Sequence, residues 1–167
     1  MKPLLIVGAG SFSPEADELA RILGYDEIAF LDNRPEGAMS APVIGDCQQV
    51  AALRGRFPEA IVALGNNADR LRWHRALKDC GYRVPALIHP TAYVSPDAEI
   101  GSGCIVRAKA VVSRHVRLGE AVILNVGALV DHHVEIGEGS HILMGAVIRN
   151  MAKLPPLSRV ESLSLVQ

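Results

Sequence analysis

The sequence predicts two folded parts: a small α/β domain over residues 1–88, followed by a three-sided parallel β-helix over residues 89–167. The β-helix is predicted by an aliphatic side chain at every sixth residue, preceded two places earlier by a small or compact residue. Glycine adds a slower period, because Gly101, Gly119 and Gly137 follow the aliphatic column at intervals of eighteen residues. The aliphatic positions are Val94, Ile100, Val106, Val112, Leu118, Leu124, Val130, Ile136, Ile142 and Ile148.

A period of six does not fit an α-helix, but it is three times the two-residue period of a strand. Each hexapeptide therefore forms one short strand and one corner, and three hexapeptides close a triangular coil. We expect the aliphatic side chain to fill the triangle and the small residue to lie where two walls converge. The glycine at every third corner is expected to allow a backbone angle that is costly for other residues.

Strands alternate with helices in the first 88 residues, which is typical of a parallel sheet. Apolar runs predict strands at 4–7, 27–31, 43–44 and 60–64. Helices are expected at 14–23, at about 46–54 and at 69–80, and a loop is expected over 34–42. Because about ninety residues supply only one half of a doubly wound domain, we predict a half-Rossmann-like unit.

Small and polar residues gather where these strands end, and a parallel sheet binds ligands at the carboxyl ends of its strands. The glycines expose the backbone, and the carboxylate of Asp32 is able to hold a sugar or ribose hydroxyl. The turn reads GAGSFS rather than G-x-G-x-x-G, so a nicotinamide cofactor, a nucleotide or nucleotide sugar, and a purely structural role stay open. The candidate substrate-binding residues are Gly8, Gly10, Ser11, Asp32, Asn33 and Gly65.

The composition argues against several classes of partner. The formal net charge is −1 and no basic run alternates with aromatic residues, so we expect neither nucleic acid nor an anionic membrane as a partner. The apolar start is too short to span a membrane and continues into glycines, which predicts a cytoplasmic protein without a signal peptide. Three cysteines without a C-x-x-C pair indicate neither a disulfide framework nor a zinc site, and no metal is expected.

Histidines concentrate in the repeat region, which holds four of the six: His115, His132, His133 and His141. His115 and His133 are eighteen residues apart, so they should stack at one corner on adjacent coils. His132 and His141 are nine residues apart, which is half a coil, so they should face different walls. Two walls of one prism do not make a cleft, but a wall of a neighbouring subunit does. We therefore predict a homotrimer with its sites in the grooves between chains.

One segment carries a specific resemblance. Residues 125–146 read NVGALVDHHVEIGEGSHILMGA, and the chain also has a glycine turn after its first strand and a His-Pro-x-Ala entry at 89–92. It resembles the bacterial sugar acyltransferases that include sialic acid O-acetyltransferases and N-acetyltransferases acting on UDP-linked 4-amino sugars. The resemblance implies a trimeric left-handed β-helix, acetyl-CoA as co-substrate, and a sugar or nucleotide-sugar acceptor in surface glycan biosynthesis.

The resemblance also implies roles for individual residues. His132 falls where the family keeps its general base, which takes a proton from the acceptor amine or hydroxyl during attack on the thioester. His141 falls where a second histidine contacts acetyl-CoA, and Asn150 falls in the segment that approaches the CoA arm. Neutral imidazole suits a base at cytoplasmic pH. Asp131 precedes the base, and whether it reaches the same ring nitrogen stays open.

Three departures from the family pattern affect the expected activity. The family has an acidic residue directly after the catalytic histidine, where this chain has His133. It has Ser-Gly-Gly where this chain has Arg149-Asn150-Met151, and a GGHG loop where this chain has GSFS at 10–13. A catalytically degenerate relative, retaining only sugar-nucleotide binding or a scaffold role, is therefore the alternative. A metal enzyme of the γ-carbonic anhydrase type is a third possibility, although the histidine spacing does not match it.

The end of the chain keeps the apolar period but changes the corner residue. Ala152/Leu154, Ser158/Val160 and Ser164/Val166 stay in register, yet Pro155 stands where glycine is expected. These residues form either one irregular capping coil or a tail that leaves the prism, and the lost glycine favours the tail. A truncated or frame-altered chain would account for the residues at 149–151 and the short length together.

Overall fold

The computed structural model describes residues 1–35 and 40–167, and the chain divides into two units, Met1–Pro85 and Ala86–Gln167. The division falls slightly before the expected boundary at residue 88. Residues 36–39 of the expected loop over 34–42 lie outside the described residues.

The first unit is a four-stranded parallel sheet with helices, as the alternating pattern predicts. Its strand order is β3-β2-β1-β4. The strands are β1 (Pro3–Val7), β2 (Glu27–Leu31), β3 (Val43–Gly45) and β4 (Ala60–Val62). The helices are α1 (Ser13–Ile22), α2 (Val50–Leu53) and α3 (Asn67–Asp79), with a 3₁₀ turn η1 (Cys47–Gln49) before α2.

Side-chain caps explain where α3 and η1 begin. Asn66 caps α3, since its side-chain oxygen accepts a hydrogen bond from the backbone N–H of Asp69 at 2.9 Å. Asp46 accepts one from Gln48 N–H at 2.8 Å, which starts η1. The single helix expected at 46–54 is therefore wrong in detail, because a 3₁₀ turn occupies its first part.

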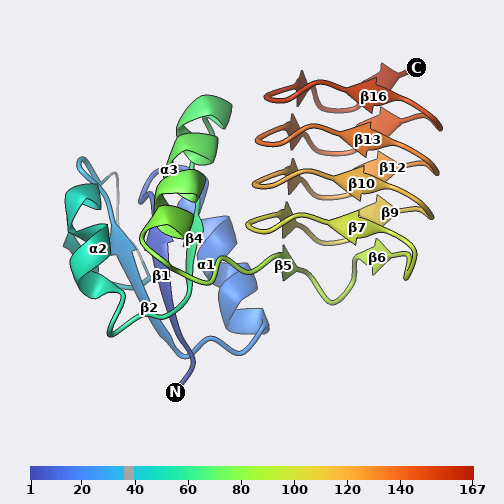
Figure 1. Cartoon of the computed structure of the whole chain (residues 1–167). Helices are drawn as coiled ribbons and strands as arrows, with labels where there is room; N and C mark the ends of the chain where they lie inside the picture. Colours follow the sequence, from blue (N-terminus) through green and yellow to red (C-terminus); the bar gives the residue numbers. More distant parts are fainter. Residues whose placement is uncertain (36–39) are drawn as a thin grey trace. The chain divides into compact units, whose positions relative to one another are not determined.

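The second unit is a three-sided stack of coils whose short strands form three parallel walls (Figure 1), one of four strands and two of five. The first wall, here called the charged face, consists of β7 (Glu99–Ile100), β10 (Arg117–Leu118), β13 (Glu135–Ile136) and β16 (Lys153–Leu154). The second, the apolar face, consists of β6 (Tyr93–Val94), β9 (Val111–Val112), β12 (Leu129–Val130), β15 (Val147–Ile148) and β18 (Leu165–Val166). The third, the His141 face, consists of β5 (Leu87–Ile88), β8 (Ile105–Val106), β11 (Ile123–Leu124), β14 (His141–Ile142) and β17 (Arg159–Val160).

The core of the prism confirms the six-residue prediction. Within each wall, a strand residue pairs with the residue eighteen positions later in the next strand. Leu118 pairs with Ile136, and Leu124 pairs with Ile142. Val112, Leu124 and Ile142 are fully buried in one continuous cluster. Each coil therefore repeats the packing of the coil before it, and burial of these side chains supplies the main stabilisation of the prism.

The glycines that recur every eighteen residues were predicted to allow a backbone angle that is costly for other residues, and this reason is wrong. Gly101, Gly119 and Gly137 do not adopt positive φ; a Cβ added to Gly119 would lie 2.6 Å from the backbone nitrogen of Glu138, in the next coil. These glycines are needed because two backbones approach closely. Positive φ occurs instead once per hexapeptide, at Gly103, Lys109, His115, Ala121, Gly127, His133, Gly139, Gly145, Met151, Leu157 and Leu163.

The expected C-terminal tail is also wrong. Strands β16, β17 and β18 pair in register with β13, β14 and β15, so residues 153–166 complete a regular coil. The apolar period decides the outcome, because Leu154 and Val160 are buried on the core. A Cβ on Gly137 would meet the backbone carbon of Pro155 at 2.6 Å, so the crowding is directed toward the following coil. Pro155 itself is exposed.

A strained leucine in the last coil provides a stability test. Leu163 has φ of +60° and a relative exposure of 84%, so it adopts a disfavoured conformation and buries little. We expect Leu163→Gly to stabilise the prism by about 0.5 kcal/mol, because relief of strain exceeds the added backbone entropy of the unfolded chain. Urea unfolding would measure the change. Leu165→Gly, in the ordinary strand conformation of β18, is the matched control and should destabilise by about 1 kcal/mol.

Candidate active site

His132 and His133 lie on the corner between β12 and β13, where the apolar face meets the charged face. His133 takes the left-handed position of this corner with φ of +59°, and His115 takes it one coil earlier with φ of +58°. Their rings stack with centroids 4.8 Å apart, which confirms that the two histidines share one corner. His132 is half-buried, while Asp131 and His133 are exposed.

The two neighbours of His132 contact different parts of it. Oδ1 of Asp131 accepts a hydrogen bond from the backbone N–H of His132 at 2.7 Å. Nδ1 of His132 lies 3.0 Å from Nδ1 of His133, with the rings perpendicular. Nδ1 of His132 therefore contacts His133 rather than Asp131. Within residues 1–35 and 40–167, Nε2 of His132 has no protein hydrogen-bond partner, and it is the nitrogen able to act as a base.

His141 lies on β14 of the opposite wall, half a coil from His132, as the spacing predicts. It precedes the inward-pointing Ile142, so its side chain faces outward from the strand, and it is 5% exposed. Among the outward-facing side chains of this wall, His141 lies one coil after Ile123, the residue of β11 with which it pairs. His132 and His141 of one chain therefore lie on different sides of the same prism.

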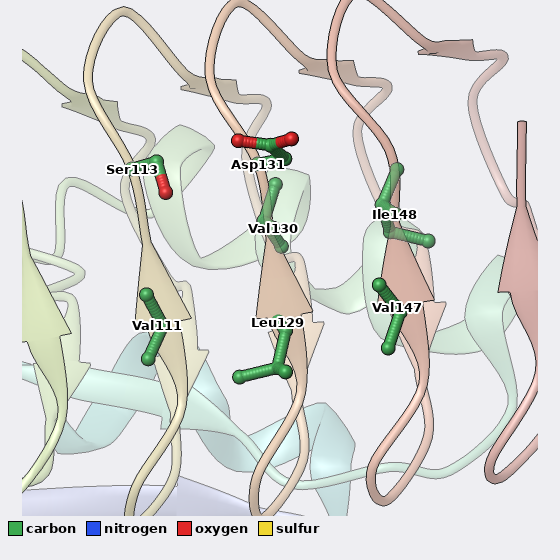
Figure 2. A pocket seen from close by; sticks show the side chains of 7 residues that line it. All are labelled: Val111, Ser113, Leu129, Val130, Asp131, Val147 and Ile148. Atoms are coloured by element: carbon green, nitrogen blue, oxygen red, sulfur yellow. The ribbon is translucent and has the colours of Figure 1, made fainter.

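The apolar face carries an unbroken column of outward apolar side chains. Tyr93, Leu129 and Leu165 are 58%, 42% and 57% exposed, and the column runs through Tyr93, Val111, Leu129, Val147 and Leu165. A groove of about 270 Å³ follows this column and reaches Asp131 at its edge, beside the corner of His132 (Figure 2). Its lining residues are Val111, Ser113, Leu129, Val130, Asp131, Val147 and Ile148.

The charged face on the other side of the corner is polar. A hollow of about 330 Å³ is lined by His115, Arg117, His133 and Glu135. Arg117 pairs with Glu99 at 3.4 Å and Lys153 pairs with Glu135 at 3.1 Å, so charges alternate along the wall. These exposed pairs contribute little to stability, and they make this wall polar beside the histidine corner.

The segment at 149–151 lies one coil after the histidine corner. Met151 donates its backbone N–H to the carbonyl of His132 at 3.1 Å, so Asn150 stands at the corner position equivalent to His132. Arg149 is exposed and Asn150 is half-buried. Met151 is 66% exposed and has φ of +62°, a conformation that a glycine adopts without strain.

The candidate substrate-binding residues belong to the first unit, at the carboxyl ends of β1, β2 and β4. Gly8 has φ of +107°, and a Cβ there would lie 2.9 Å from the carbonyl oxygen of Ala63, so only glycine fits. Asp32 accepts backbone hydrogen bonds from Ala9 and Arg34, each at 2.6 Å. Its carboxylate therefore closes the loop, and only its remaining lone pairs are available to a ligand.

The other members of this set are more open. Gly10 and Gly65 have no atom within 4 Å of an added Cβ, which leaves space for a ligand to approach the backbone. Ser11 is exposed. Asn33 accepts a hydrogen bond from Cys47 N–H at 3.0 Å, and burial, with the Asp32 carboxylate, raises the pKa of the Cys47 thiol. Cys47 therefore stays protonated at neutral pH.

Sequence analysis gave no role to Arg70, which lies in the helix expected at 69–80. Arg70 is fully buried and donates from Nη1 to the carbonyl of Leu64 at 2.9 Å and from Nη2 to Oδ1 of Asn67 at 2.8 Å. It thus fixes the Leu64–Gly65 turn at the edge of the candidate site. The signal was its place in the first turn of α3, directly after that turn.

The described residues form neither a metal-binding cluster nor a membrane-spanning helix. None of residues 1–35 and 40–167 falls into a group of three or more histidine, cysteine or acidic side chains placed to hold a metal ion. Across the same residues, no helix combines the length and apolar character needed to cross a bilayer.

The chain matches known proteins over both units. The family model of the PglD N-terminal domain matches residues 3–77. The acetyltransferase domain of PglB from Neisseria gonorrhoeae FA1090, in complex with acetyl coenzyme A, is 33% identical with a TM-score of 0.78; the match covers 99% of this chain and 92% of that one. No curated protein sequence matches significantly.

Two further structures extend this similarity. A histidine-to-asparagine mutant of perosamine N-acetyltransferase from Caulobacter crescentus, in complex with CoA and GDP-perosamine, is 27% identical with a TM-score of 0.84, covering 99% of this chain and 88% of that one. WeeI from Acinetobacter baumannii AYE, 15% identical with a TM-score of 0.59 over 90% of this chain and 93% of that one, shares the fold. The chain therefore belongs to the bacterial sugar acetyltransferases built on a half-Rossmann-like domain and a hexapeptide-repeat, left-handed β-helix.

Proposed function

We propose that this protein transfers the acetyl group of acetyl-CoA to an amino or hydroxyl group of a nucleotide-linked sugar, in surface polysaccharide or glycan biosynthesis. One observation carries the proposal: His132 stands at an open corner with Nδ1 engaged by His133 and Nε2 available as a base. The acetyl-CoA complex of the Neisseria domain and the CoA and GDP-perosamine complex of the Caulobacter enzyme support the two substrates.

The proposed chemistry is direct transfer. The acceptor nitrogen or oxygen attacks the thioester carbonyl while His132 Nε2 takes its proton. The carbon–sulfur bond then breaks, and the proton passes to the sulfur of the departing CoA. A positioned base of this kind contributes about 10²–10⁴-fold to the rate. His141 is proposed to contact acetyl-CoA near the developing oxyanion, and Asn150 to line the CoA arm.

We propose that the active form is a homotrimer. His132 and His141 lie on different sides of one prism, so one chain alone does not assemble the pair. The outward column of the apolar face supports association of the three chains, because contiguous exposed apolar side chains mark protein–protein contact surfaces. In this arrangement Asp131, at the edge of the apolar groove, orients the corner backbone rather than the imidazole.

The proposed nucleotide-sugar site lies at the strand ends of the first unit, and comprises Gly8, Gly10, Ser11, Asp32, Asn33 and Gly65. Gly10 and Gly65 leave open backbone, and Asp32 supplies the acceptor for a hydroxyl. We place the reaction in the cytoplasm, where acetyl-CoA and nucleotide sugars are made.

A coupled assay tests the function. The full-length protein is incubated with acetyl-CoA and with UDP- or GDP-linked amino sugars or free sialic acid, and CoA release is followed together with the mass of the product. Acetylated product from at least one acceptor supports the proposal. Binding of nucleotide sugar without binding of acetyl-CoA would establish the alternative, a degenerate family member, for which the bulky residues at 149–151 are the supporting observation.

Met151 provides a direct test of that alternative. We expect Met151→Gly to tighten acetyl-CoA binding by roughly tenfold, about 1.4 kcal/mol, because it removes an exposed side chain from the segment proposed to approach the CoA arm. Calorimetric titration would measure it. Leu163→Gly, the same change at the left-handed position of another corner, is the control and should leave the affinity unchanged. Equal affinities for all three proteins would contradict the placement of the CoA arm.

A further inference from the structure

Two imidazoles meet through the same type of nitrogen at the proposed catalytic corner. Nδ1 of His132 is 3.0 Å from Nδ1 of His133, the ring planes are at 89°, and the centroids are 5.1 Å apart. At this distance one nitrogen carries a proton and donates it to the other. The alternative partner, Asp131, does not compete, because its carboxylate accepts the backbone N–H of His132.

We propose that His133 is a positioning residue that holds His132 in the tautomer able to act as a base; this inference rests on the proposed acetyl transfer. When His132 donates its Nδ1–H to His133, Nε2 of His132 keeps its lone pair and accepts the proton of the attacking group. In the reverse arrangement His133 donates, Nε2 of His132 carries the hydrogen, and no lone pair faces the acceptor. The direction of one hydrogen bond thus decides activity.

Charged and titratable groups surround the pair. Glu135 lines the same hollow as His133, and its carboxylate pairs with Nζ of Lys153 at 3.1 Å. The other groups around the pair are His115, stacked on His133, Arg117 in the hollow, Arg114 whose carbonyl accepts the His133 backbone N–H at 3.1 Å, and Arg149 in the next coil.

The same contact supports the charged state of the base. After Nε2 takes the acceptor's proton, the His132 imidazolium donates Nδ1–H to neutral His133, and this charge-assisted bond stabilises the cation. The proton then passes from Nε2 to the sulfur of CoA, and the pair is again neutral.

Glycine at position 133 gives a clean deletion with a matched control. Gly127 and Gly145 occupy the same left-handed position at another corner, with φ of +66° and +64°, so glycine suits this backbone conformation. We expect His133→Gly to lower kcat by about 10–100-fold, with KM for both substrates within about twofold. His115→Gly makes the same change one coil earlier, beside His133 and away from His132, and should leave kcat and KM within about twofold.

Rescue and a spectroscopic readout separate positioning from folding. His133→Glu supplies an acceptor without imidazole and should restore kcat to within a few-fold of the native value. Nitrogen-15 NMR of the histidine side chains should show hydrogen on Nδ1 of His132 in the native protein, and on Nε2 in His133→Gly. The tautomer can be measured without turnover.

Different outcomes would overturn the role of His132 as the base and the role of His133 as a positioning residue. Full activity of His132→Ala would remove the proposed base, and with it this inference. An inactive His132→Ala combined with a fully active His133→Gly, or an unchanged His132 tautomer in His133→Gly, would overturn the inference alone. Equal loss in His115→Gly and His133→Gly would show that the corner histidines act only through the fold.

Discussion

Replacing His132 with alanine is expected to lower kcat for acetyl transfer by about 10²–10⁴-fold, because the variant lacks the group proposed to take the acceptor's proton. KM for acetyl-CoA should change little, since His132 is proposed to act on the acceptor. The half-buried corner position predicts an unchanged fold. Steady-state kinetics, with circular dichroism and particle mass as controls, would measure the effect. Activity within threefold of the native protein would rule out His132 as the base.

Mixing two inactive variants extends this test to the interface. His141→Leu should also be inactive, and leucine fits the outward column beside Ile123. If each site takes His132 from one chain and His141 from the next, randomly mixed trimers of the two variants regain both histidines in about one quarter of their sites. Recovery near one quarter of native activity after co-refolding is expected. No recovery would mean that both histidines act within one chain, or that no shared site forms.

Gly119→Ala is expected to produce the largest loss of stability, about 3 kcal/mol. The added Cβ would lie 2.6 Å from Glu138 N and 2.9 Å from Glu138 Cα, which are backbone atoms of the next coil that cannot rotate away. The coils must separate at that corner, which weakens the ladder on both adjoining walls. Urea unfolding monitored by circular dichroism would measure the change.

Gly127→Ala is the control for this prediction. Gly127 has φ of +66° with nothing within 4 Å of an added Cβ, so alanine there meets an unfavourable angle without a collision. We expect a loss of about 1 kcal/mol, and Ala121, with φ of +54°, shows that alanine is tolerated in this conformation. A loss at Gly127 equal to that at Gly119 would contradict the distinction between crowding and backbone strain.

The repeat made the prism predictable, because a strict period places every aliphatic residue in the same environment on successive coils. The strand positions of the first unit were predictable for a similar reason, since each is a local apolar run. For the site, residue spacing predicted only which corner or wall each histidine occupies. His115 and His133 were expected at one corner, and His132 and His141 on different walls. Arg70 was missed, because its burial depends on the turn it supports and not on a period.

The sequence by itself determined the two-part architecture, the coil of eighteen residues, and the half-coil separation of the two candidate catalytic histidines. Tertiary structure alone decided which neighbour meets the ring nitrogen of His132, why Gly119 must be glycine, and whether residues 153–166 stay on the prism. The physical reason is that a sequence repeat specifies only the repeating backbone geometry. These three outcomes depend on side-chain torsions and on contacts between residues eighteen or more positions apart.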